Sequence, residues 1–301
     1  MNRFINNQNG AVAVIIALLM SVFLGISALV IDGGMLYMEK QKLRNVADAA
    51  ALAGAQELPT TPDRAVSKAI EAINLNEEDP NEFTITFSKN NHRITVRAEK
   101  SVDLVFAKVL GFAEAKVDAV SHSEIGTLTS GRGAVPVGVE YTSPLIFGEI
   151  KRLKVEDATV GNFGALAIQG PGANIYEEDF KMGYDQELRI NQIVNTQTGN
   201  LAGPTVRAVN YRISACPTST YLDFPEDCPR VVLVPVFQSV VTEQNQVKAV
   251  KIVGFAEFFI ENVTSSGTSA EIVGRFIEET ASGEIAYDSS NYGAYGYKLT
   301  R

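Results

Sequence analysis

The chain is poor in the residues from which catalytic and metal-binding sites are usually built. It has no tryptophan, and only two cysteines and two histidines occur among its 301 residues. His92 and His122 lie far before Cys216 and Cys228 in the chain, so these four residues do not have the spacing of a zinc site. So few histidines also disfavour a Ser–His–Asp triad.

Sequence motifs of the common enzyme and cofactor classes are missing as well. There is no phosphate-binding loop of the form GxxxxGK[ST], no HExxH zinc helix, no GxSxG nucleophile elbow and no CxxC redox pair. The acidic group at 177–179 lacks the alternating carboxylates of an EF-hand, so we interpret it as a solvated turn rather than a calcium site. We therefore expect a protein that is not an enzyme and that holds neither a cofactor nor a metal ion. The competing hypothesis, a hydrolase held on a stalk, requires a pocket in which titratable groups converge.

Positive charge is scarce. The sequence has 26 lysines and arginines against 35 acidic residues, for a net charge of −9. The basic residues are scattered, whereas binding to nucleic acid requires a basic stripe, so we exclude a nucleic-acid partner. Hydrophobic residues make up 46% of the chain, enough to bury a core in two domains beyond the N-terminal segment.

The longest uncharged run of the chain lies almost at its N-terminus. No charged residue occurs from Ala11 to Ile31. About 21 helical residues cover roughly 30 Å, the hydrocarbon thickness of a bilayer. A removable secretory leader has a shorter apolar core, and a buried core helix of this length would have a polar face. We favour a permanent membrane anchor at 11–31, preceded by a short N-terminal segment at 1–10, over these two alternatives.

An amphipathic stalk helix is predicted directly after the anchor, at 32–58. Apolar or small residues recur at helical spacing at Leu36, Leu43, Ala47, Ala50, Gly54 and Leu58. At the membrane edge, either Asp32 caps a second helix while Gly33 and Gly34 permit a bend, or one helix continues straight through. The small-residue stripe packs either against the protein's own domain, which we favour, or against a partner helix in self-association.

The two cysteines and the basic residues bear on the compartment. Cys216 and Cys228 enclose a loop of about 12 residues, and a disulfide across such a loop stabilises by roughly 3 kcal/mol. We favour a disulfide, which suits an oxidising compartment, over free buried thiols or metal ligands. Arg3 precedes the span, whereas three basic residues follow it, namely Lys40, Lys42 and Arg44. The positive-inside rule then favours a cytoplasmic body, but the rule is weak when a long domain follows the span.

The N-terminal segment resembles a known family. It begins at Gly10 with GAVAV, ends its apolar span with Asp32–Gly33, and continues with Tyr37, Leu43–Asn45 and the alanine-rich run Ala47–Ala55. This combination is similar to the N-terminus of the TadG-like proteins of tight-adherence (Flp) pilus assembly. More loosely, Gly161–Gly164 and Gly199–Thr205 are similar to runs in the downstream domain of such proteins.

The resemblance implies a single-pass protein of the cell membrane, accessory to a pilus machine, with residues 1–10 as a short cytoplasmic N-terminus and its bulk outside the cytoplasm. Its implied partners are the lipid bilayer and pilus assembly components or the cell-wall surface. On orientation, the resemblance takes precedence over the count of basic residues.

Two departures from the family limit what is carried over. Many TadG-like proteins have a von Willebrand A domain whose metal site needs Asp-x-Ser-x-Ser, and the run Asp288–Tyr292 fails this pattern because it ends in Tyr292. We therefore expect no such domain and no metal site. Prepilin processing would cleave between Gly10 and Ala11, but Ile15 stands where a glutamate is expected. A minor pilin or pseudopilin packed in a filament is therefore the alternative hypothesis.

An α+β fold is predicted for the remainder. A short helix at 63–73, a hairpin turning at Asn90–Asn91, a helical segment at 103–110 and a strand at 115–125 make a small α/β domain at 62–125. A glycine-containing run near 126–134 marks a boundary. Residues 127–301 are expected to form a β-rich extracytoplasmic domain, an antiparallel sandwich or barrel. Its expected strands are Val135–Val139, Arg230–Val241, Val247–Asn262 and Glu271–Glu279, and the tail 291–298 is either an edge strand or an exposed contact patch.

Overall fold

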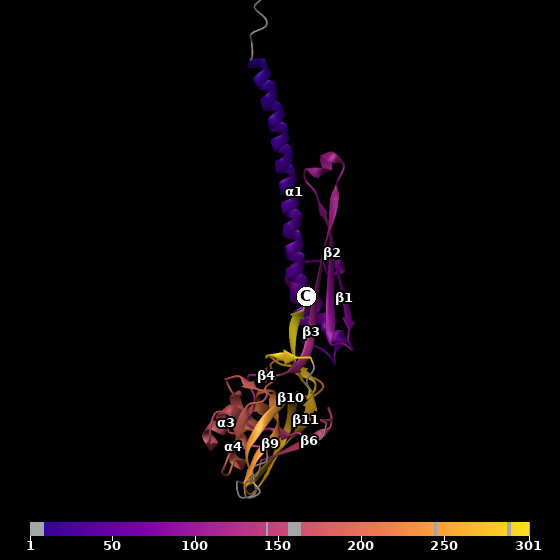
Figure 1. Cartoon of the computed structure of the whole chain (residues 1–301). Coiled ribbons are helices and arrows are strands. Elements are labelled where there is room, and N and C mark those ends of the chain that lie inside the picture. Colours follow the sequence, from indigo (N-terminus) through magenta and orange to yellow (C-terminus); the bar gives the residue numbers. More distant parts are fainter. Residues whose placement is uncertain (1–8, 143, 156–163, 244–245, 288–289, 301) are drawn as a thin grey trace, which may run out of the picture.

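The computed structural model describes residues 9–142, 144–155, 164–243, 246–287 and 290–300. The molecule is elongated: a long helix projects from a small sheet unit, and a larger strand-rich unit lies at the opposite end (Figure 1). The α+β architecture predicted from the sequence, a long N-terminal helix followed by strand-rich structure, is confirmed.

Helices occupy the N-terminal segment and cover parts of both sheets. The α-helices are α1 (Asn9–Ala55), α2 (Pro62–Leu75), α3 (Ala173–Met182) and α4 (Ala202–Ala215), and the short 3-10 helices are η1 (Pro80–Glu82) and η2 (Ala107–Leu110). The strands are β1 (Phe83–Ser88), β2 (Arg93–Asp103), β3 (Glu114–Leu128), β4 (Ser130–Gly131), β5 (Val139–Glu140), β6 (Ile150–Val155), β7 (Leu188–Arg189), β8 (Ile193–Asn195), β9 (Val231–Glu243), β10 (Gln246–Ser266), β11 (Ser269–Ile277), β12 (Glu279–Thr280), β13 (Ile285–Ala286) and β14 (Ala294–Thr300).

The small unit is a sheet on which the second half of α1 lies. The strand order is β1-β2-β3-β14-β12, with β13 also paired to β3. Alternating apolar residues of β2 and β3 face α1, and α2 packs against α1. The resulting core includes Leu43, Val46, Ala47, Ala50, Ala51, Ala55, Ala65, Ala69, Ile73, Ile94, Val96, Ala98, Val117, Ala119 and Tyr295.

The larger unit is built on three long antiparallel strands. Its sheet has the order β5-β9-β10-β11-β6, and α3 and α4 form a pair of which α4 contacts β10 and β11. The strands predicted at 230–241, 247–262 and 271–279 correspond to β9, β10 and β11. Their β-branched and aromatic side chains fill the core between sheet and helices, in agreement with their strand propensity.

The end of the chain differs from its predicted placement. β14 pairs antiparallel with β3, from Tyr295 opposite Thr127 to Thr300 opposite His122. The C-terminal strand therefore belongs to the small unit, although it was expected in the domain at 127–301. Of the two predictions for the tail, the exposed patch is wrong for its first half, because Tyr295 is buried at 3% exposure between β3 and β12.

Three local predictions were also wrong. The segment 103–110 is not one helix, since β2 extends to Asp103 and η2 covers four residues. The group at 177–179 is not a turn but part of α3. The strand predicted at 135–139 is only partly formed, since β5 begins at Val139 and Val137 makes an isolated bridge. In each case long-range pairing or helix packing overrides a weak local pattern.

Candidate functional site

From Val12 to Ile31, α1 is exposed except at Ala28, which is partly covered. The helix is long and apolar enough to cross a membrane, and its most apolar stretch is 0% buried. Large side chains from Val12 to Ile31 are about half or more exposed, among them Phe23 at 66%. The buried-core-helix alternative for 11–31 is therefore wrong. The possible processing site, Gly10 and Ala11, lies in the first turn of α1, while Arg3 lies outside the described residues.

The second half of α1 is buried in the small unit. Leu43, Ala47 and Ala50 are fully buried in its core. Gly54 lies so close to β2 that an added Cβ would stand 2.5 Å from Ile94 Cδ1. The small-residue stripe is therefore used for packing against the protein's own sheet and α2, the use we favoured from the sequence.

Asp32 caps a neighbouring loop and not a helix of its own. α1 continues without interruption past Asp32, Gly33 and Gly34, so the straight alternative is the observed one. The Asp32 carboxylate is 4% exposed. It accepts hydrogen bonds from the backbone N–H groups of Val105 at 2.9 Å, Phe106 at 3.1 Å and Ala107 at 2.7 Å. These contacts hold the tip of the β2–β3 hairpin against α1 at the point where the apolar run ends.

A group of ion pairs also joins α1 to the small unit. Lys100 of β2 contacts Glu39 of α1 and Glu78 at 2.7 Å each. Lys42 contacts Glu78 at 2.5 Å, and Lys40 lies 3.9 Å from Asp118. Two of the three basic residues that follow the apolar run are thus paired with carboxylates of the folded body.

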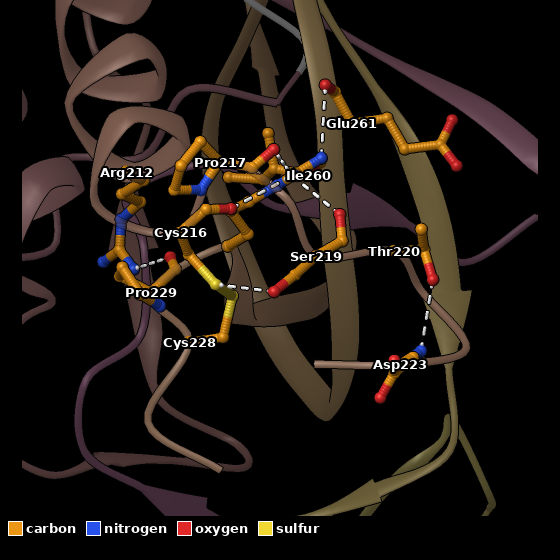
Figure 2. Close-up of a disulfide and its surroundings, with 11 residues drawn as sticks. Arg212, Cys216, Pro217, Ser219, Thr220, Asp223, Cys228, Pro229, Ile260 and Glu261 are labelled. Atoms are coloured by element: carbon orange, nitrogen blue, oxygen red, sulfur yellow. Dashed lines mark hydrogen bonds between the residues drawn. A yellow bond between two sulfur atoms is a disulfide. The ribbon is translucent and has the colours of Figure 1, made fainter. Parts of the chain in front are cut away.

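The structure joins Cys216 and Cys228 by a disulfide with a Cα–Cα distance of 5.8 Å (Figure 2). Both cysteines are buried beside Phe259 and Ile277. The bond closes the loop between α4 and β9, which we call the disulfide loop (residues 216–228). In this geometry the two cysteines are neither free thiols nor metal ligands, which were the two alternatives.

Two buried arginines hold the disulfide loop to the larger unit. Arg230 donates to the backbone oxygens of Ile260 at 2.8 Å and Ser219 at 2.8 Å, and its guanidinium lies 4.6 Å from the centroid of the Phe259 ring. Arg212 donates to the carbonyls of Phe180 and Pro229 at 2.6 Å each. Burial lowers the pKa of Arg212 to about 10. Carbonyl oxygens bind these cations without neutralising them, so the loop is fixed by charge-assisted hydrogen bonds.

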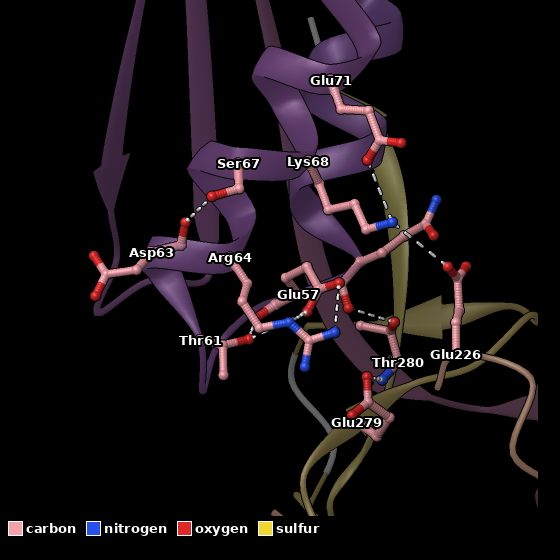
Figure 3. Close-up of polar contacts among 11 residues, drawn as sticks. Glu57, Thr61, Asp63, Arg64, Ser67, Lys68, Glu71, Glu226, Glu279 and Thr280 are labelled. Carbon is pink, nitrogen blue, oxygen red and sulfur yellow. Dashed lines mark hydrogen bonds and ion pairs between the residues drawn. The ribbon is translucent and has the colours of Figure 1, made fainter. Parts of the chain in front are cut away.

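A cavity of about 590 Å³ lies where the two units meet. Its lining comes from the end of α1, the start of α2, the disulfide loop and β10 to β12. Arg64 Nε lies 3.1 Å from the Glu57 carboxylate, and Lys68 Nζ lies 3.9 Å from Glu226 on the disulfide loop (Figure 3). The Thr280 hydroxyl donates to the Gln56 carbonyl at 2.8 Å. These polar contacts connect the stalk, the small unit and the disulfide loop across one space.

Two carboxylic acids of this cavity have strongly displaced pKa values. Burial raises the pKa of Glu257 to about 8; nearby Glu279 adds to the shift and Arg212 opposes it. Burial raises the pKa of Glu279 to about 7, opposed by the Thr280 amide and Arg64 and aided by Glu57 and Glu226. Titratable groups therefore do converge in a pocket, as the hydrolase hypothesis requires, although none of the residues that line it is a histidine.

The sequence analysis missed the buried charges of this region. Glu257 stands inside the apolar run Phe255–Ile260, and a lone carboxylate in a buried strand is a signal that could have drawn notice. Arg212, Arg230 and Glu279 gave no comparable signal, because their burial depends on how α4, the disulfide loop and β12 pack. No group of three or more metal-ligating side chains occurs within the described ranges. Of the motifs predicted above, Gly161–Phe163 and Asp288–Ser289 lie outside those ranges.

Comparison with known proteins agrees with the sequence resemblance. A family described as putative Flp pilus-assembly TadE/G-like matches residues 10–57, the segment that contains the apolar span and the buried stalk. Comparison with curated proteins and with solved structures gave no match. The resemblance noted from the sequence is therefore confirmed for this segment: residues 10–57, of which 10–55 lie in α1, are similar to the TadE/G-like Flp pilus-assembly family.

Proposed function

We propose that the protein is a single-pass membrane component of a tight-adherence (Flp) pilus assembly system whose folded body works outside the cytoplasm. The observation that carries this proposal is the division of α1 into two halves. One half is apolar and exposed apart from Ala28, and the other half is built into the core of the body. A continuous helix of this kind holds the folded body at a fixed distance from the membrane. The family match covers this same helix.

The extracytoplasmic orientation is supported by two features. A disulfide between Cys216 and Cys228 is favoured by an oxidising compartment. The basic residues that follow the span, Lys40 and Lys42 among them, have little weight under the positive-inside rule, because a long folded domain follows the span.

A structural role without catalysis is part of the same proposal. The cavity between the units is lined by residues of the disulfide loop and of the segment that follows α1, and none of the lining residues is a histidine or a lysine. At neutral pH Glu257 is then mainly protonated and Glu279 partly protonated, which lowers the repulsion between acidic segments, and the two are not an acid–base pair acting on a substrate.

The orientation is tested by cysteine labelling of the full chain in intact cells. Thr268 is exposed in the turn between β10 and β11, so a Thr268→Cys variant offers a free thiol on the distal body. An Asn2→Cys variant offers one before the span. We expect a membrane-impermeant maleimide to label Thr268→Cys and to leave Asn2→Cys unlabelled until the cells are lysed. The reverse pattern would overturn the proposed orientation.

The pilus role, and the alternative of a filament subunit, are tested by exchange of the span. Residues 11–31 are replaced by an unrelated transmembrane segment of equal length, and the variant is produced in the host strain that lacks the natural chain. If the span is an anchor, the exchanged chain restores surface pili; if the span packs in a filament, restoration fails although the unaltered chain succeeds. Intact mass gives a second criterion, because cleavage after Gly10 would remove Arg3. A strain that keeps normal pili without the chain would contradict the pilus role itself.

A further inference from the structure

The tip of the β2–β3 hairpin is an exposed apolar loop. The ten residues at 104–113 read LVFAKVLGFA and contain one charged residue, Lys108. Four large apolar side chains are exposed to solvent: Val105 at 56%, Phe106 at 42%, Val109 at 88% and Phe112 at 65%. Exposed apolar patches mark interaction sites, and these four side chains lie within eight residues of one loop.

The position of this tip relative to the membrane follows from Asp32. Three consecutive backbone N–H groups, from Val105 to Ala107, donate to the Asp32 carboxylate and leave it 4% exposed. Asp32 directly follows the uncharged run that ends at Ile31, so the tip is tied to α1 at the boundary of the apolar span.

The tip also reaches back along the helix towards the span. The hairpin runs beside α1 with its turn on the side of the N-terminal half (Figure 1), and η2 contacts α1. Ala28, one turn before Asp32 on the same helix face, is partly covered, whereas Ala13 and Ala17 are exposed. The tip therefore lies beside the last turn of the apolar span and not below it.

The chemistry of the tip fits a bilayer surface. Phe106 and Phe112 offer aromatic rings at the depth where such rings are favoured, as does Tyr37 of α1, which is 67% exposed. Lys108, with a half-exposed side chain 3.8 Å from Asp103, has the long apolar stem and cationic end that suit the headgroup region. A water-facing loop has no comparable reason to leave four large apolar side chains uncovered.

We propose that the hairpin tip, residues 104–113, inserts into the lipid headgroup region of the membrane that α1 spans. The body would then have two attachments to the bilayer, one through α1 and one through the tip, which fix its depth and its rotation about the helix axis. This inference rests on the proposed function insofar as α1 must cross a bilayer, but the insertion of the tip is a separate property.

The natural absence of tryptophan allows a direct test. A single tryptophan is introduced into the full chain, which is reconstituted in phosphatidylcholine–phosphatidylglycerol vesicles whose acyl chains are brominated either near the headgroup or near the terminal methyl. The test variants are Val109→Trp and Phe112→Trp, at exposed positions where little packing is lost. Phe23→Trp within the span and Leu222→Trp on the disulfide loop, both exposed, are the matched controls.

We expect Val109→Trp and Phe112→Trp to be quenched several-fold more than Leu222→Trp, and more by shallow than by deep bromines. Phe23→Trp should also be quenched. Deep bromines should quench it more strongly than they quench the two tip variants. Unquenched tip tryptophans together with a quenched Phe23→Trp would overturn the insertion and leave the anchor intact. A blue-shifted but unquenched tip would likewise overturn it, because the apolar contact would then be with protein. An unquenched Phe23→Trp would overturn the membrane anchor itself, and with it the insertion.

Discussion

At the scale of single residues, Gly54 decides how closely α1 approaches the sheet and α2. An added Cβ would stand 2.5 Å from Ile94 Cδ1 and 2.9 Å from the Ala65 carbonyl oxygen. Because one of these neighbours is backbone, a larger residue requires α1 to move away from α2. Gly54 therefore allows α1 to pack closely against both α2 and the sheet.

We predict that Gly54→Ala lowers the free energy of unfolding by about 1–3 kcal/mol through overpacking, despite a gain in helix propensity of about 1 kcal/mol. Gly34→Ala is the matched control, since nothing lies within 4 Å of its added Cβ. It should be neutral or slightly stabilising. Thermal unfolding of the detergent-solubilised full chain measures both, and equal shifts in the two variants would contradict the packing argument.

At the scale of elements, the disulfide loop connects three parts of the fold. Arg212 and Arg230 hold its ends to α3 and β10, and Lys68 of α2 approaches its Glu226. Tyr221 and Phe224 of the same loop line the cavity between the units. The disulfide thus constrains a segment that supports the position of the small unit relative to the larger one.

We predict that the double variant Cys216→Ser, Cys228→Ser loses about 3 kcal/mol of stability, the magnitude expected for a loop of this length. The reason is that the unfolded chain regains freedom which the disulfide removes. Thermal unfolding with and without a thiol reductant measures the effect. The reductant should lower the midpoint of the unaltered chain and leave that of the double variant unchanged; a midpoint insensitive to reductant in both would argue against a stabilising disulfide.

At the scale of the whole molecule, α1 joins an exposed apolar segment to the folded body, and the acidic cavity lies where the two units of that body meet. In the folded protein the pKa of Glu257 is raised to about 8 and the pKa of Glu279 to about 7, whereas the ordinary pKa of a glutamate is 4.5. An unfolded chain releases these protons at lower pH. The free energy of unfolding should therefore fall as the pH rises from about 4.5 to about 8 and recover on acidification.

We predict that Glu257→Gln and Glu279→Gln reduce this loss of stability. At pH 8 each should raise the unfolding midpoint, at about 2–4 °C per kcal/mol for a chain of this size. Glu149→Gln is the control, since its side chain is 60% exposed on the surface. Unfolding midpoints measured between pH 5 and pH 8 decide the question. A pH profile that the two cavity variants leave unchanged would show that these carboxylic acids are not protonated in the fold.

The features that the sequence determined by itself are local ones. The uncharged run at 11–31, the proximity of Cys216 and Cys228, and the strand patterns that became β9 to β11 can all be recognised because each depends on neighbouring residues. Tertiary structure alone decided the return of β14 to the first sheet, the use of Asp32 as a cap for the hairpin tip, and the meeting of Glu257 with Glu279. These features join residues far apart in the chain, and no local periodicity or spacing encodes which distant segments will pair.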